Sequence, residues 1–233
     1  MHKVLQYFRG FVSLFYPKTC ISCGNVLLLS EKLMCTHCHY NLPQTHFLEQ
    51  DETAMDDIFK GRVRVEKAFA LYFFQKSGGV QKMIHLLKYR NRPDIGVFLG
   101  NLLGNQLLNS ELLPKLDVII PIPLHPKRKK QRGYNQSEMI ANGISEIVDI
   151  KVDTDSVIRE EYTSTQTKKS RISRWQNVKS GFKVVNPDLI ENKHILIVDD
   201  IITTGATIEA CVQNILQVPN VVVSVACIGY AKS

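Results

Sequence analysis

Two adjacent aspartates, Asp199 and Asp200, follow a short apolar run in the segment HILIVDDIITTGATIEA at 194–210. The run at 195–198 is continuous and mostly β-branched, which predicts a strand buried on both faces. Neighbouring carboxylates repel each other unless a cation or hydroxyl groups meet them. The residues that follow offer hydroxyl groups and free backbone N–H groups at the start of a predicted helix, where anions bind: Thr203, Thr204, Gly205, Ala206 and Thr207. The stretch therefore predicts a site for a phosphate with a polyol beside it.

Two C-x-x-C pairs, separated by eleven residues, contain four of the six cysteines: Cys20, Cys23, Cys35 and Cys38. This spacing is typical of a zinc ribbon, in which four thiolates enclose a structural zinc ion and leave no position open to water. His37 and His39 lie close enough to replace one sulfur, so the ligand set stays open at this point. Two disulfides are the competing interpretation, which an intracellular location disfavours. Cys211 and Cys227 are expected to be buried core thiols.

Two basic segments could meet a polyanion. The segment PKRKKQR at 126–132 holds five cations: Lys127, Arg128, Lys129, Lys130 and Arg132. The second lies in the long polar stretch at 159–182 and includes Trp175. Cations interleaved with aromatic rings suit single-stranded nucleic acid, whose phosphates are neutralised while its bases stack. A solvated charged face, with Trp175 simply packed, is the alternative interpretation.

The elements that position these residues follow from composition and periodicity. A chain of 233 residues with 44% hydrophobic and 22% charged residues can bury one full core and a small module. The net charge of +7 is compatible with polyanionic partners. Strands are predicted at 65–74, 117–123, 195–198 and 220–228. Helices are predicted on both sides of Arg92–Pro93 within 80–109 and at 133–148, with a basic loop at 124–132. This alternation predicts a doubly wound parallel sheet.

The N-terminal segment at 1–17 has apolar residues at helical spacing and ends at Pro17. It is expected to form a short amphipathic helix packed on the protein, because Arg9 interrupts the run that a signal peptide would need. No apolar run approaches the ~20 residues of a membrane span. A cytoplasmic location is therefore expected.

The segment ILIVDDIITTGAT resembles the phosphoribosyl pyrophosphate (PRPP) fingerprint of type I phosphoribosyltransferases. Three further features resemble the ComF family, which includes competence protein ComFC and GntX-like proteins. They are the four-cysteine ribbon, the segment IHLLKYRNRPDIG, and the segment PIPLHPKRKKQRGYNQ. The resemblance implies an α/β fold of the type I phosphoribosyltransferase kind behind a small zinc ribbon. The expected domains are the N-terminal helix and ribbon at 1–45, a linker at 46–64, and the phosphoribosyltransferase-like domain at 65–233.

The resemblance also implies roles for the site residues. Asp199 and Asp200 would accept hydrogen bonds from the ribose hydroxyls of PRPP, and 203–207 would wrap its 5′-phosphate. Arg128 and Arg132 would hold the pyrophosphate, and Mg²⁺ would bridge pyrophosphate and ribose oxygens. Lys88 and Tyr89 could face either the pyrophosphate or the ribbon, and the sequence leaves both alternatives open.

The ComF resemblance implies a role in natural transformation, in which single-stranded DNA is handled on the cytoplasmic side with a helicase-like partner. Lys127, Lys129, Lys130 and Trp175 are the nucleic-acid-binding candidates. The alternative is a true Mg²⁺-dependent phosphoribosyltransferase of unknown acceptor. Neither the ribbon nor the polar stretch shows a pattern that recognises an acceptor base, which favours a binding module.

Overall fold

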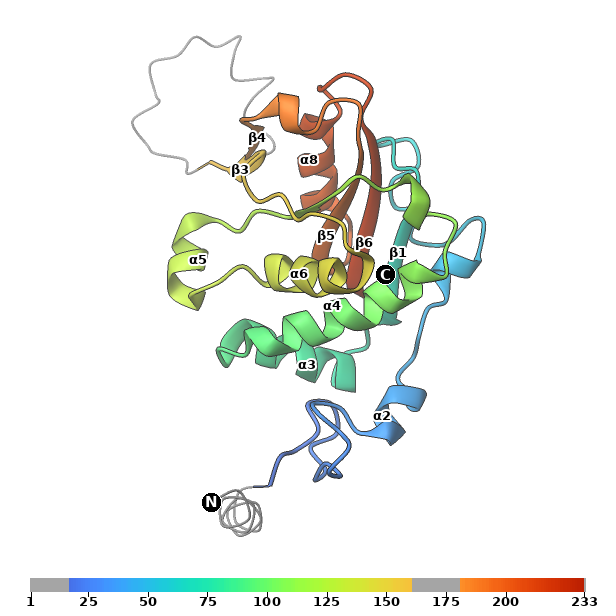
Figure 1. The fold of residues 1–233 in the computed structure, drawn as a ribbon, viewed down its shortest axis with the longest axis vertical. Helices are drawn as coiled ribbons and strands as arrows, with labels where there is room; N and C mark the ends of the chain where they lie inside the picture. Colours follow the sequence, from blue (N-terminus) through green and yellow to red (C-terminus); the bar gives the residue numbers. More distant parts are fainter. Residues whose placement is uncertain (1–16, 161–180, 233) are drawn as a thin grey trace.

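The computed structural model describes residues 17–160 and 181–232 and contains a four-stranded sheet (Figure 1). The strand order is β1 (Ala68–Phe73), β6 (Val222–Tyr230), β5 (His194–Ile202) and β2 (Val118–Pro121). Every pair of neighbouring strands is parallel. Val152 extends the sheet beyond β2 through a single parallel bridge to Ile119. The expected parallel sheet is therefore confirmed.

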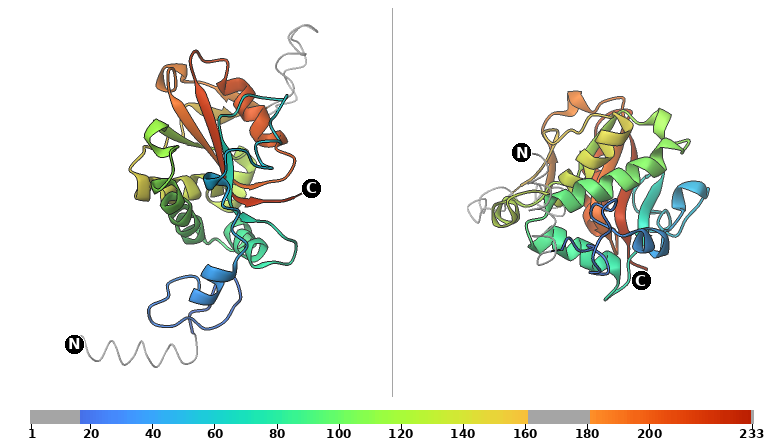
Figure 2. Two further views of the ribbon diagram at one scale, coloured as in Figure 1. Left: turned by 90° about the vertical axis from the view of Figure 1, so that its right-hand side faces the viewer. Right: turned by 60° about the horizontal axis from the view of Figure 1, so that its bottom comes forward.

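Helices cover both faces of the sheet, as a doubly wound fold requires (Figure 2). On one face lie α4 (Pro93–Leu108) and α6 (Gln136–Val148), and on the other lies α8 (Ala206–Ile215). The helix α3 (Gly79–Tyr89) lies beside α4, on the side of the cysteine-rich ribbon (Figure 1). The predicted break at Arg92–Pro93 separates α3 from α4, and Pro93 is the first residue of α4.

The pair α4 and α6 packs with its backbones in contact. Glycines recur every fourth residue along α4, at Gly96, Gly100 and Gly104. A Cβ atom on Gly100 would collide with the carbonyl oxygen of Ile140, and one on Gly143 would collide with the carbonyl oxygen of Val97. Only glycine permits this approach, which holds the beginning of α6 in place beside β5 and β2.

The segment at 46–64, expected to be a linker, contributes side chains to the core. Phe47 begins the short helix η1 (Phe47–Glu49), and Met55 and Phe59 are fully buried. Just before it, the backbone of Gln44 bridges to Tyr72 and covers the outer edge of β1. The segment is mostly polar, and for that reason it was expected to be a linker. Its few large apolar side chains pack into the core and hold the segment against the domain.

Two further expectations are corrected in detail. The predicted basic loop contains a helix, α5 (Pro126–Arg132), because Pro126 occupies the first helical position and His125 caps it. The strand β5 continues through the two aspartates to Ile202 rather than ending before them. The remaining short elements are α2 (Thr36–Asn41), η2 (Leu113–Lys115), η4 (Pro187–Leu189), and the antiparallel pair β3 (Val157–Arg159) and β4 (Phe182–Val184).

Cys211 and Cys227 are buried core thiols, as expected. Within the described ranges, no helix has both the length and the apolar character needed to cross a bilayer. The expected helix at 1–17, except for Pro17, and the segment with Trp175 at 161–180 lie outside the described residues.

Candidate functional site

The first carboxylate of the site, Asp199, lies near the carboxyl end of β5 and accepts two hydrogen bonds at one oxygen. The hydroxyl of Ser137 donates to its Oδ1 over 2.9 Å, and the backbone N–H of Asp200 donates to the same atom over 2.8 Å. Ser137 belongs to the first turn of α6, which Asn135 caps through its side chain. The helix start thus delivers a hydroxyl donor to the end of the neighbouring strand.

Lys88 partners the second carboxylate. Its Nζ lies 2.8 Å from Oδ1 of Asp200, and both side chains are largely buried. Lys88 comes from the last turn of α3, and the hydroxyl of Tyr134 donates to the carbonyl of Leu87 in the same turn. Lys88 therefore faces the paired aspartates rather than the ribbon.

Asp199 titrates far from its ordinary range. Desolvation and the neighbouring Asp200 carboxylate raise its pKa to about 7, although the Asp200 N–H, Ser137 and Lys88 favour the charged form. The pair therefore carries fewer than two negative charges at neutral pH, and Lys88 offsets a further one. The negative charge of the two carboxylates is therefore largely compensated, so that an anionic ligand can bind beside them.

The predicted phosphate loop at 203–207 joins β5 to α8. Gly205 has φ of 75° and caps the start of α8, a left-handed conformation that favours glycine. A Cβ atom there would lie 2.5 Å from Cγ2 of Ile58, so a larger residue would also collide with that side chain. The other members of the loop are exposed: Thr203, Thr204, Ala206 and Thr207. Their hydroxyls and the N–H groups at the start of α8 are accessible to an anion.

Arg62 supports this loop from the segment at 46–64. Its guanidinium donates to the carbonyl oxygens of Thr204, over 2.9 Å, and Ile58, over 3.1 Å. It also pairs with Glu209 in the first turn of α8. Sequence reasoning missed Arg62, because 142 residues separate it from Thr204 and no local pattern marks it.

The basic helix α5 follows β2 and exposes four cations to solvent: Lys127, Arg128, Lys129 and Lys130. Lys129 lies 3.6 Å from Glu138 of α6. Arg132, at the end of α5, lies over the ring of Tyr89, with 5.5 Å between the guanidinium carbon and the ring centroid. Because Tyr89 directly follows Lys88, contacts run from the paired aspartates through the end of α3 to α5. Of the two arginines expected at the pyrophosphate, Arg132 is the one that contacts the end of α3.

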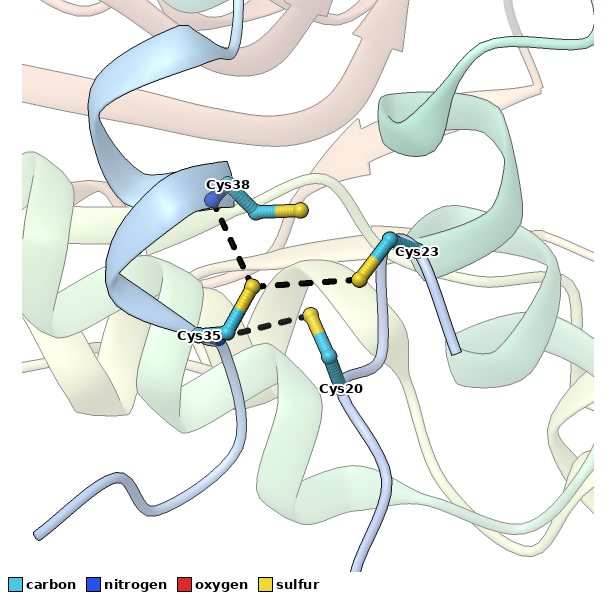
Figure 3. A group of neighbouring side chains, drawn as sticks. All are labelled: Cys20, Cys23, Cys35 and Cys38. Carbon is cyan, nitrogen blue, oxygen red and sulfur yellow. Dashed lines mark hydrogen bonds between the residues drawn. The ribbon is translucent and has the colours of Figure 1, made fainter. Parts of the chain in front are cut away.

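The four cysteines of the two C-x-x-C pairs converge on one centre (Figure 3). All four Sγ atoms lie within 4.8 Å of one another, and those of Cys23 and Cys35 are 3.8 Å apart. Four sulfurs at ~2.3 Å from a zinc ion would be about 3.8 Å apart, so the cluster fits a tetrahedral site. The cluster contains neither His37 nor His39, which favours the all-sulfur ligand set.

The metal-free thiols differ in their affinity for protons. Burial raises the pKa of Cys20, but backbone N–H groups of Cys35, Cys23 and Ser22 outweigh it and lower the value to about 6. Burial raises the pKa of Cys38 to about 12. Thiolates are the zinc-binding form, so loading the site would release protons.

The ribbon contacts the beginning of α3. A Cβ atom on Gly79 would collide with the hydroxyl of Ser22, which lies between the first two cysteines, and would touch Leu42. The same helix carries Lys88 in its last turn. One helix thus joins the four-cysteine cluster to the paired aspartates.

Comparison with known proteins places a phosphoribosyl transferase domain at residues 135–231. The DNA utilization protein YhgH of Escherichia coli K12 is 32% identical over 149 residues, which are 63% of this chain and 65% of that protein. Competence protein F of Haemophilus influenzae is 32% identical over 130 residues, 54% of this chain and 57% of its own length. The chain thus spans less than two thirds of these relatives. Glutamine PRPP amidotransferase from B. subtilis, complexed with ADP and GMP, has a TM-score of 0.43 at 22% identity, covering 60% of this chain and 30% of that one.

Proposed function

We propose that the chain acts in DNA uptake or utilization. Its matches support a ComF-family assignment, with a type I phosphoribosyltransferase-like α/β domain and a four-cysteine ribbon. In this role it binds PRPP at the paired aspartates and single-stranded DNA along α5. We further propose a cytoplasmic location and a helicase-like protein partner, as the ComF resemblance implies.

The arrangement of the paired aspartates and the loop at 203–207 carries the PRPP proposal. The carboxylates of Asp199 and Asp200 accept hydrogen bonds from the ribose hydroxyls. The N–H groups at the start of α8 and the exposed threonine hydroxyls donate to the 5′-phosphate. Lys88 releases Asp200 when the ribose binds and turns to a phosphate oxygen of the ligand.

Magnesium fits this proposal through the chemistry of its donors. Carboxylate and phosphate oxygens are the hard ligands that Mg²⁺ prefers, and it keeps several of its waters. Beside Asp199 and Asp200, the ion would neutralise pyrophosphate charge. The zinc proposal has a different basis: the spacing of the four sulfurs suits a tetrahedral zinc ion.

Thermal unfolding with PRPP and Mg²⁺ tests the site. A ligand that binds only the folded state at a hundred times its Kd should raise the Tm by roughly 5–10 °C for a chain of this size. Asp200→Asn and Gly205→Val should abolish the shift while the unliganded protein remains folded. Glu146→Gln, an exposed carboxylate at the far end of α6, is the matched control and should keep the full shift. No shift for the wild type at millimolar PRPP would refute PRPP binding.

A true phosphoribosyltransferase is the second candidate. The paired aspartates at the end of β5, directly before the loop at 203–207 within the matched phosphoribosyl transferase domain, are the observation that favours it. Release of pyrophosphate from PRPP, measured over a panel of nucleobases and nucleic acids with and without Mg²⁺, distinguishes the two candidates. Turnover with any acceptor would establish the enzyme.

A further inference from the structure

We propose that the PRPP site also takes the 5′-phosphorylated end of a single DNA strand, with Lys88 and Arg132 on the phosphates that follow. The inference rests on the proposed function, because it uses the same phosphate loop and the same basic helix. It adds that the two ligands share one site and that the strand is held by its end.

The chemistry common to the two ligands is a pentose with a phosphate monoester on its C5 oxygen. PRPP carries this group, and so does the first nucleotide of a 5′-phosphorylated strand. A monoester has three free oxygens and nearly two negative charges at neutral pH. A phosphodiester within a strand has two free oxygens and one charge. The exposed donors at 203–207 and the start of α8 therefore favour a strand end over an internal phosphate.

The position of Lys88 gives the strand a direction. In the proposed pose, the aspartates lie beside C2 and C3 of the pentose. A deoxyribose has no oxygen at C2, and its C3 oxygen carries the next phosphate, which therefore arrives beside the paired aspartates. Lys88 lies there, with its Nζ 2.8 Å from Oδ1 of Asp200 and 23% of its side chain exposed. Its ammonium group can pair with that phosphate, whereas uncompensated carboxylates would repel it.

The surface beyond Lys88 continues to suit a single strand. Tyr89 is 64% exposed, and its ring can stack on a base. Arg132 contacts the same ring, and α5 carries the exposed cations Lys127, Arg128, Lys129 and Lys130. A strand entering by its 5′ end would therefore meet four features in turn. They are the phosphate loop at 203–207, Lys88, the ring of Tyr89 and the basic helix α5.

One groove of the described surface is unsuited to this ligand. It is a groove of about 950 Å³ between α4 and the segment that covers β1. Four carboxylates line it, against two lysines: Glu49, Asp51, Glu66 and Glu111, with Lys67 and Lys115. Its net negative charge repels phosphates, so a strand is directed to α5.

Fluorescence anisotropy with matched oligonucleotides tests the inference. Strands of one sequence carry a dye at the 3′ end and either a phosphate or a hydroxyl at the 5′ end. The 5′-phosphorylated strand should bind about tenfold more tightly or better, as a charge-assisted set of hydrogen bonds predicts. PRPP with Mg²⁺ should remove this advantage and leave the affinity of the 5′-hydroxyl strand unchanged.

Variants separate the strand end from the rest of the surface. Lys88→Gln should weaken the 5′-phosphorylated strand selectively, and Lys88→Arg should restore its advantage. Replacing Lys129 and Lys130 with alanine should weaken the binding of both strands alike and keep the ratio of their affinities.

Equal affinities for the two strands, in protein that PRPP stabilises, would overturn the inference and leave the PRPP proposal standing. A 5′-phosphate preference without a PRPP shift would refute PRPP binding and, with it, the claim that the two ligands share one site. Absence of DNA binding at low salt would overturn the inference and the proposed DNA binding together.

Discussion

The carboxyl group of Asp199 couples folding to pH, because desolvation and the adjacent Asp200 raise its pKa to about 7 from an ordinary value of 3.8. The folded chain therefore binds this proton more tightly than the unfolded chain. By linkage, the stabilisation is fully present below about pH 4 and is lost as the pH rises to about 7.

Asp199→Asn should reveal this dependence, because the amide has no proton to lose. The free energy of unfolding of the variant, relative to the wild type, should rise with pH between about 4 and 7. The limiting slope is about 1.4 kcal/mol per pH unit, and the difference should be constant above about pH 8. Denaturant titrations at several pH values measure it, with Asp188→Asn, an exposed carboxylate of η4, as the control. A difference independent of pH would contradict the raised pKa.

Residues of the site differ in how far the sequence could predict them. Asp199, Asp200 and the loop at 203–207 form one contiguous segment, so a local pattern describes them. For Lys88 the sequence left open whether it faces the pyrophosphate or the ribbon, since its partner lies 112 positions away. Arg62 and Ser137 carry no local signal of their contacts, which exist only once the sheet brings distant segments together.

The segment at 46–64 acts as a support for the phosphate loop, and Arg62 is the positioning residue that tests this. Arg62→Ala should weaken PRPP binding about three- to tenfold, because the loss of hydrogen bonds worth about 1 kcal/mol each frees the carbonyl of Thr204. Arg62→Lys should recover part of the affinity, and Arg64→Ala, a neighbouring exposed arginine, should have no effect. Titration of the PRPP-induced Tm shift gives the affinities. Unchanged affinity in Arg62→Ala would show that the loop holds its shape unaided.

The cations of α5 should displace counter-ions from the phosphates of bound DNA, so the affinity should fall as the salt concentration rises. Each cation that neutralises a phosphate should contribute ~0.7 to the slope of log affinity against log salt. Replacing Lys129 and Lys130 with alanine should flatten the slope and weaken all sequences alike, because phosphate contacts carry no sequence information. Trp175→Ala should lower the affinity at an unchanged slope if that ring stacks on a base. Anisotropy over a range of salt concentrations measures both, and an unchanged slope in the double variant would move the binding surface elsewhere.

At the scale of elements, the strands and long helices could be predicted because their apolar periodicity is local. The basic segment at 126–132 was expected to be a loop, because its charge hid two helix signals, Pro126 at the first position and a cap at His125. The segment at 46–64 was expected to be a linker for the same kind of reason. Its buried residues, Met55 and Phe59, are too few and too far apart to give a period.

Across the whole molecule, α3 links the metal cluster to the phosphate site. We expect one zinc ion per chain, and Cys35→Ser should lower both zinc content and solubility, because so small a module depends on its metal to fold. Since the ribbon packs against the start of α3, the PRPP-induced Tm shift should shrink as well. Metal analysis and thermal unfolding measure the two effects. Cys211→Ala, which removes a core thiol, should keep the zinc, and freshly purified wild-type protein without zinc would refute the site.

The strand order has a consequence for how the chain is made. Of the four strands of the sheet, β6 comes last in chain order, yet it lies in the interior, between β1 and β5. Until residue 230 has left the ribosome, β1 and β5 each present an unpaired inner edge, and such edges are templates for aggregation. The sheet therefore cannot form strand by strand in the order of synthesis, because it closes only when β6 inserts between β1 and β5.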